Sequence, residues 1–284
     1  YSKKKDTGVA SNWDSCGNYN KKREKMKTIL IQILLIGEGL LSLLQAQEYK
    51  EVLRFDSPAA RQAVAVGDHH IYAIDNHHII KYTLDGDSVG EWKDDAPFSV
   101  KHLNSGIVVG DKLYCAHSNY PELPMASSIE IFDTNTMQHC GNISFGIQYG
   151  SCTWIIPGED CWYVFFAHYE NKSQQPGRDV SWSQLVRFDC QWRATQAWVL
   201  PSGLVERVRP YSLSGAVRIN GKFYCTGHDA RECYVLSLPE SGSRLHWETT
   251  IPVPFFGQGI ACDSDKNLWG IDRKKREIIK AQYK

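Results

Sequence analysis

Three histidines, His117, His168 and His228, occupy the same position in three copies of a repeated sequence phrase, and Asp75 and Asp272 occupy it in two further copies. Neutral imidazoles at equivalent positions could bind a divalent cation or act as general acid and base. Carboxylates beside them could share either task. If the five positions converge in space, three imidazoles and two carboxylates surround one site.

The phrase consists of an apolar strand, a turn rich in Gly and Asp, and an aromatic-centred strand that ends at the His or Asp. It recurs about every 45 residues, with one longer interval. The copies run over Gln62 to Asp75, Ser105 to His117, Ser151 to His168, Ser214 to His228 and Gln258 to Asp272. Five copies at this period predict a radial or stacked β-repeat.

Each copy continues into a third alternating strand, and the first four copies into a fourth. The last copy has no fourth strand because the chain ends, whereas Glu51 to Phe55 forms a strand pattern without a partner. Pairing the two closes a ring and removes exposed sheet edges. The sequence therefore predicts an all-β fold, a five-bladed β-propeller of four-stranded antiparallel blades whose N-terminal strand completes the last blade. The predicted blades are about 59–95, 99–146, 149–201, 209–254, and 257–284 together with 51–55.

Residues 26–46 resemble a secretory signal peptide, with basic Lys27, an apolar run from Ile29 to Leu44, and Ala46 before a cleavage point. A membrane anchor is the alternative, but Glu38 interrupts a run that is short for a span. We expect residues 1–25 to be a disordered upstream extension and residues 47–284 to be the propeller domain. The expected location is secreted or periplasmic, with no membrane span after cleavage.

Residues 1–46 hold 8 of the 32 Lys and Arg and 4 of the 32 Asp and Glu, which leaves 24 cations and 28 anions in the predicted domain. This slightly acidic balance excludes a nucleic-acid partner, which needs clustered cations. Eight of the nine cysteines remain. Because Cys115 and Cys225 share one repeat position, buried core thiols are favoured over a disulfide framework, and a Cys225–Cys233 bridge is the alternative.

In a four-stranded blade, the loop after the second strand and the connection to the next blade lie on the same face, so loop residues gather there. The loops after His117 and His168 are long and carry Tyr120 and Tyr169. Loops on a rigid scaffold are where binding residues concentrate. The candidate catalytic residues are the three histidines with these two tyrosines. The candidate substrate-binding residues are Arg61, His102, Arg178, Tyr211, Asp229, Arg231, Gln258, Asp75 and Asp272.

Three interpretations of the histidines remain open. In the first, the rings cap solvent-exposed strand ends and bond to the backbone. In the second, they form a polar ligand-binding or catalytic site. In the third, His117, His168 and His228 bind one divalent metal ion, which for zinc requires ring nitrogens about 2.0–2.1 Å from the ion. No other cofactor is indicated. The chain has no GxSxG, HExxH or CxxC motif. A glycosidase needs two carboxylates at a defined separation, and nothing in the sequence selects a pair.

The repeat resembles that of β-propellers across residues 48–284 but lacks the WD and kelch signatures, so no specific family is indicated. In size the chain is similar to secreted bacterial five-bladed propellers, several of which process glycans. At the level of fold alone, the resemblance implies a monomer that binds and processes a glycan or another small polar ligand. An acidic-polysaccharide lyase or a hydrolase would be the activity. The alternative is a non-catalytic propeller that binds a ligand or protein, and the sequence does not decide between them.

Overall fold

The computed structural model describes residues 48–96 and 99–284. The predicted extension (1–25) and signal peptide (26–46) lie outside the described residues. Within the described part, no helix is long and apolar enough to cross a membrane.

The structure is built from five groups of four antiparallel strands. The first group is β2 (Ala63–Val66), β3 (His70–Asp75), β4 (His78–Thr83) and β5 (Ser88–Lys93). The second is β6 (His102–Val109), β7 (Lys112–Ser118), β8 (Ser127–Asp133) and β9 (His139–Gly146). The third is β10 (Ser151–Pro157), β11 (Cys161–Ala167), β12 (Gln184–Asp189) and β13 (Ala194–Val199). The fourth is β14 (Gly215–Ile219), β15 (Lys222–Thr226), β16 (Glu232–Ser237) and β17 (His246–Pro252). The fifth is β18 (Phe256–Cys262), β19 (Leu268–Asp272), β20 (Glu277–Tyr283) and β1 (Tyr49–Asp56).

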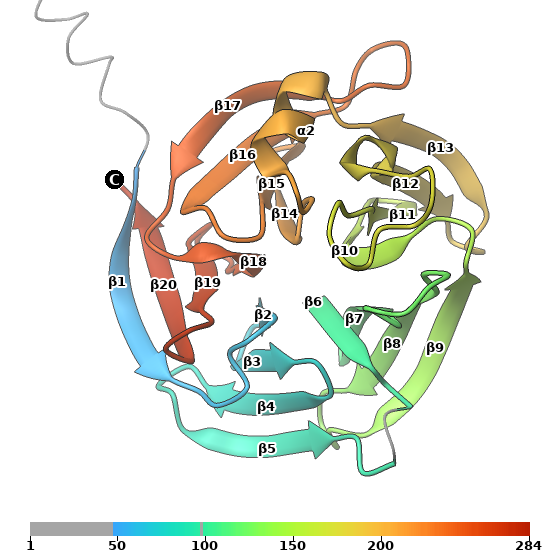
Figure 1. Ribbon diagram of the computed structural model, residues 1–284. Coiled ribbons are helices and arrows are strands. Elements are labelled where there is room, and N and C mark those ends of the chain that lie inside the picture. Colours follow the sequence, from blue (N-terminus) through green and yellow to red (C-terminus); the bar gives the residue numbers. More distant parts are fainter. Residues whose placement is uncertain (1–47, 97–98) are drawn as a thin grey trace, which may run out of the picture. The chain divides into compact units, whose positions relative to one another are not determined.

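The five groups lie around a common centre, with β2, β6, β10, β14 and β18 innermost (Figure 1). Burial follows this order, since β10 is almost entirely buried whereas β13, the outer strand of the same group, is almost entirely exposed. The predicted all-β class and four-stranded antiparallel sheets are therefore confirmed, and the arrangement fits a β-propeller.

The N-terminal strand pairs with the C-terminal one, as the sequence predicts. In the antiparallel β1–β20 ladder, Tyr49 lies opposite Tyr283 and Asp56 lies opposite Glu277. The fifth group also adjoins the first, because a parallel bridge joins Gly259 of β18 to the first residue of β2. Strands from the two ends of the described chain thus complete one sheet, and the sheet edge of β20 is covered.

Aromatic side chains fill the space between neighbouring groups. Trp154 stacks on Phe165 of its own group at 5.1 Å between ring centroids, and its ring also lies 6.1 Å from that of Phe223 in the next group. Trp92 of the first group packs 4.6 Å from Phe132 of the second. These tryptophans have the inter-sheet packing role expected from the sequence, and each such ring adds a large apolar area to the core.

Two short elements were not predicted. Helix α2 (Ser202–Val208) joins the third and fourth groups and buries Leu204, Val205 and Val208. A 3₁₀ turn, η1 (Val180–Trp182), lies in the long loop after β11 and buries Val180. Among the described cysteines there is no disulfide, and Cys115, Cys152, Cys161, Cys225 and Cys233 are buried thiols. The buried-thiol interpretation is confirmed.

Candidate functional site

A cavity of about 530 Å³, here called the polar cavity, opens where the inner strands begin. Residues just before β2 and β14, and residues among the first three of β6, β10 and β18, form its floor, and the loops after the second strands form its walls. It is lined by Arg61, Gln62, Asn76, His77, Lys101, His102, Asn104, Tyr120, Pro121, Thr153, Tyr169, Lys172, Tyr211, Ser214, His228, Gln258 and Arg273.

Hydrogen bonds between neighbouring strands hold the floor of the polar cavity. The amide of Gln62 donates to Asn76 Oδ1 at 2.7 Å. Asn104 donates to the Cys152 carbonyl at 2.8 Å, and Thr153 donates to the Leu213 carbonyl at 2.8 Å. The first bond lies within the first group of strands, and the other two join the second group to the third and the third to the connection before the fourth. The floor is therefore a set of fixed polar groups that need no rearrangement to meet a polar ligand.

One wall of the polar cavity is aromatic. The ring of Tyr120 lies 5.1 Å from that of His102 and 5.4 Å, edge to face, from that of Tyr169. Tyr169 is anchored by its hydroxyl, which donates to Ser151 Oγ at 3.0 Å. Burial, together with the nearby His117 and Arg61, lowers the pKa of His102 to about 4. At neutral pH this wall is therefore an uncharged aromatic surface of the kind on which a sugar ring stacks.

The charged side chains that line the polar cavity are all cations. Arg61, Lys101, Lys172 and Arg273 line it, whereas no Asp or Glu is among its described lining residues. Two of the cations have carboxylate partners outside the described lining, since Lys101 pairs with exposed Glu122 and Arg61 Nε lies 3.8 Å from an oxygen of Asp75. An anionic ligand is therefore favoured, because cations in a confined site attract and hold it.

His228 stands at the centre of a cluster at one side of the polar cavity. Its ring stacks on that of Tyr211, with centroids 3.8 Å apart. Nδ1 lies 2.8 Å from Asp229 Oδ2, and Nε2 lies 3.0 Å from an Nη of Arg273. A guanidinium can only donate, so Nε2 carries the lone pair and the proton is on Nδ1, near the carboxylate but without a well-aligned hydrogen bond to it.

The charge state of His228 follows from these neighbours. Burial lowers its pKa and Arg273 lowers it further, while the Asp229 carboxylate opposes them. The ring is therefore neutral near pH 7, with a free base at Nε2 once Arg273 moves away. A neutral imidazole with its proton on Nδ1 and a carboxylate 2.8 Å from that nitrogen is an arrangement suited to general-base catalysis.

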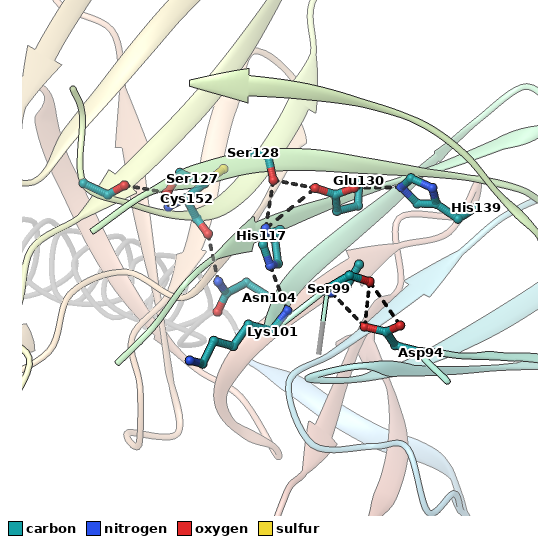
Figure 2. A network of polar contacts seen from close by, with 12 residues as sticks. Asp94, Ser99, Lys101, Asn104, His117, Ser127, Ser128, Glu130, His139 and Cys152 are labelled. Atoms are coloured by element: carbon teal, nitrogen blue, oxygen red, sulfur yellow. Dashed lines mark hydrogen bonds and ion pairs between the residues drawn. The ribbon is translucent and has the colours of Figure 1, made fainter. Parts of the chain in front are cut away.

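His117 does not line the polar cavity; it supports the cavity wall from behind. Figure 2 shows the chain of contacts. Nε2 accepts from the backbone N–H of Lys101 at 3.0 Å, and Nδ1 lies 2.8 Å from Ser128 Oγ. Ser128 donates to buried Glu130 at 2.5 Å, and the other oxygen of Glu130 lies 2.7 Å from His139 Nε2. Because Nε2 accepts from the backbone, His117 has the backbone-bonding role that the sequence left open.

His168 is likewise held by backbone groups. It is 3% exposed, its Nε2 donates to the carbonyl of Tyr149 at 3.0 Å, and burial lowers its pKa to about 4. His117, His168 and His228 are each bonded to different protein groups, so the structure does not bring the three rings together as the metal interpretation requires. In the part of the chain that the structure describes, no three His, Cys, Asp or Glu side chains gather in a way that could hold a metal ion.

Four more predicted binding residues lie outside the cavity lining. Asp75 lies behind Arg61 and accepts from Arg276 at 3.0 Å, and Asp272 is buried in a turn that it caps. The guanidinium of Arg178 lies over Trp182 at 5.3 Å, and that of Arg231 over Phe256 at 4.4 Å. A fifth, Asp229, contributes through His228. The predicted residues that do line the cavity are Arg61, His102, Tyr120, Tyr169, Tyr211, His228 and Gln258.

Sequence reasoning missed several cavity residues that the repeat itself marks. Each copy of the phrase has a polar residue within two positions of its start, and the floor is made of these residues: Gln62, Asn104, Thr153, Ser214 and Gln258. Arg273 directly follows the predicted position Asp272. The start of the phrase therefore carries a signal as regular as its end, and of these five residues only Gln258 was predicted.

Comparisons with known proteins give similarity in fold alone. No family model matches the chain, and no curated protein matches it. A solved glutaminyl cyclase from Myxococcus xanthus aligns over 84% of this chain and 97% of its own, with 9% identity and a TM-score of 0.56. RS223-β-xylosidase covers 83% and 94%, with 12% identity and a TM-score of 0.51. A GH43_1 enzyme from Xanthomonas citri covers 86% and 92%, with 10% identity and a TM-score of 0.50. At these identities the fold is shared and no mechanism is transferred.

Proposed function

We propose that this chain is a five-bladed β-propeller that binds an acidic glycan in the polar cavity and cleaves it by β-elimination. The observation that carries the proposal is the composition of the cavity, which combines four cations and an aromatic wall with no Asp or Glu among its described lining residues. A uronic-acid polymer offers the matching chemistry, a carboxylate on every ring and an apolar sugar face.

The elimination would use the His228 cluster. A uronate carboxylate draws Arg273 from His228 and forms a bidentate pair with it, which exposes the lone pair on Nε2. Nε2 then removes the proton on the carbon next to the carboxylate, and Arg273 stabilises the negative charge that develops on the carboxylate oxygens. The electron pair forms a carbon–carbon double bond as the bond to the neighbouring glycosidic oxygen breaks. In this scheme Tyr211, whose ring stacks on His228, gives that oxygen a proton.

A hydrolase is the second candidate, favoured by the fold that the chain shares with RS223-β-xylosidase and the GH43_1 enzyme. Glycoside hydrolysis commonly requires two carboxylates that flank the scissile bond. Three carboxylates contact the described lining: Asp75 beside Arg61, Glu122 beside Lys101, and Asp229 beside His228. All three are engaged with cationic or imidazole partners, so elimination is the better-supported chemistry.

The test is cleavage of a panel of soluble uronic-acid polymers, followed by the ultraviolet absorbance of the unsaturated product. We expect absorbance from the wild type and a loss of about 10²–10⁴-fold in kcat/KM for His228→Gln, which removes the base. His246→Gln, at an exposed histidine on the outer strand β17, is the control and keeps full activity. New reducing ends that form without the ultraviolet absorbance of an unsaturated product would support the hydrolase. Binding without either product would support the non-catalytic propeller.

We further propose that the protein is secreted or periplasmic, which is supported by the signal-like sequence of residues 26–46. Mass spectrometry of the exported protein tests this, and we expect an N-terminus at Gln47. An intact residue 1 on the cell-associated protein would contradict it.

A further inference from the structure

A second cavity lies at the opposite ends of the same inner strands. Its volume is about 320 Å³, and it is here called the apolar cavity. It is lined by Val66, Gly106, Ile107, Ile156, Pro157, Ala216, Val217, Arg218, Ile219, Asn220, Ile260, Ala261, Cys262, Asp263 and Lys266. The residues that begin the inner strands line the polar cavity, and those that end them line this one. The two cavities share no residue.

Direct strand contact separates the two cavities. A Cβ added at Gly259 of β18 would lie 2.4 Å from the Cβ of Ala63 and 2.7 Å from that of Ser105, and one at Gly215 would lie 2.6 Å from the Gln258 carbonyl. The backbone of β18 therefore packs tightly against β2, β6 and β14 at mid-height. A ligand in one cavity does not occupy the other.

The chemistry of the apolar cavity differs from that of the polar one. Branched aliphatic side chains from all five inner strands line it. Its charged lining residues are Arg218, Asp263 and Lys266. Asp263 already accepts from Trp269 Nε1 and Lys280 Nζ, each at 3.0 Å. Lys266 donates only to the neutral amide of Asn220, at 3.2 Å, and Arg218 lies 5.4 Å from the ring of Tyr163. Within the described residues, neither cation has a carboxylate partner within ion-pair distance.

We propose that the apolar cavity binds a small amphipathic carboxylate, with its hydrocarbon part among the inner-strand side chains and its carboxylate between Arg218 and Lys266. Apolar walls with a few convergent polar groups are typical of small-molecule sites, and the volume falls at the lower end of their range of about 300–1,000 Å³. Burial of the chain supplies the affinity, and the two cations select the acid over a neutral analogue.

Isothermal titration calorimetry with octanoate, and with octanamide as the uncharged probe of matched length, tests this site. We expect one octanoate per chain and about tenfold weaker binding for Arg218→Gln and for Lys266→Gln, because each loses a charge-assisted hydrogen bond. Octanamide should bind the wild type about as weakly as octanoate binds these variants. The exposed Arg244→Gln, outside both cavities, is the control and leaves the affinity unchanged. Equal affinities for the two probes would overturn the proposal.

Thiol alkylation locates the bound acid without any substitution. Cys262 lines the apolar cavity, whereas Cys140 and Cys190 are exposed elsewhere. Octanoate should slow alkylation of Cys262, measured by mass spectrometry of tryptic peptides, and leave the other two rates unchanged. Unchanged alkylation of Cys262 at saturating octanoate would overturn the proposal, and the proposed glycan cleavage would be unaffected.

Discussion

Replacing His117 by leucine separates a structural from a catalytic role for this ring. The substitution removes the acceptor 3.0 Å from the Lys101 N–H and the partner 2.8 Å from Ser128 Oγ. An unmade bond at a buried backbone N–H costs about 1–3 kcal/mol, and Lys101 is only partly buried, so we expect about 1–2 kcal/mol. In a domain of this size each kcal/mol lowers the Tm by about 2–4 °C, which gives a fall of roughly 2–8 °C.

Differential scanning calorimetry measures that fall, and the product absorbance at 20 °C measures activity. We expect His117→Leu to keep kcat/KM within about tenfold of the wild type, well short of the loss that removal of a general base causes. His117→Gln is the matched control, because its amide oxygen can accept the Lys101 N–H and restore part of the stability. An unchanged Tm with a hundredfold loss of activity in the leucine variant would refute the structural role.

Three further predictions concern pH and packing. In the folded state His102 and His168 have pKa values of about 4, against an ordinary value of 6.5 in the unfolded chain. Because the unfolded chain protonates these rings first as the pH drops, the free energy of unfolding falls between about pH 6.5 and pH 4. Urea titrations should show up to ~1.4 kcal/mol lost per pH unit for each ring; stability that rises in this range would contradict it. Asp229→Asn removes the group that raises the pKa of His228, so the acidic limb of the pH–rate profile should move to lower pH. An unmoved limb would exclude an electrostatic effect of Asp229 on a catalytic His228. Gly259→Ala should destabilise the fold by about 1–3 kcal/mol or more in urea, because its Cβ overlaps a neighbouring strand; wild-type stability would show that the inner strands are not in contact.

The fold was predictable because its signals are periodic. Alternation along each strand and regular turns fixed the strands, and the unpaired pattern at Glu51 to Phe55 identified the partner of β20. Helix α2 was missed because seven residues between two predicted blades show too little periodicity to mark a helix.

The candidate site was predictable in place but not in role. The repeat register placed the histidines near one end of the sheets, yet it does not say where a ring points. His117 and His168 turn toward the backbone, whereas His228 faces the cavity. That difference comes from neighbours distant in sequence, such as Arg273 for His228, and spacing along the chain does not report it.

A crystal structure of the His228→Gln variant with a uronic-acid oligosaccharide tests the central claim most directly. The account predicts a sugar in the polar cavity with its carboxylate paired to Arg273 and the adjacent carbon facing position 228. A sugar bound elsewhere, or one bound with its carboxylate turned away from Arg273, would contradict it.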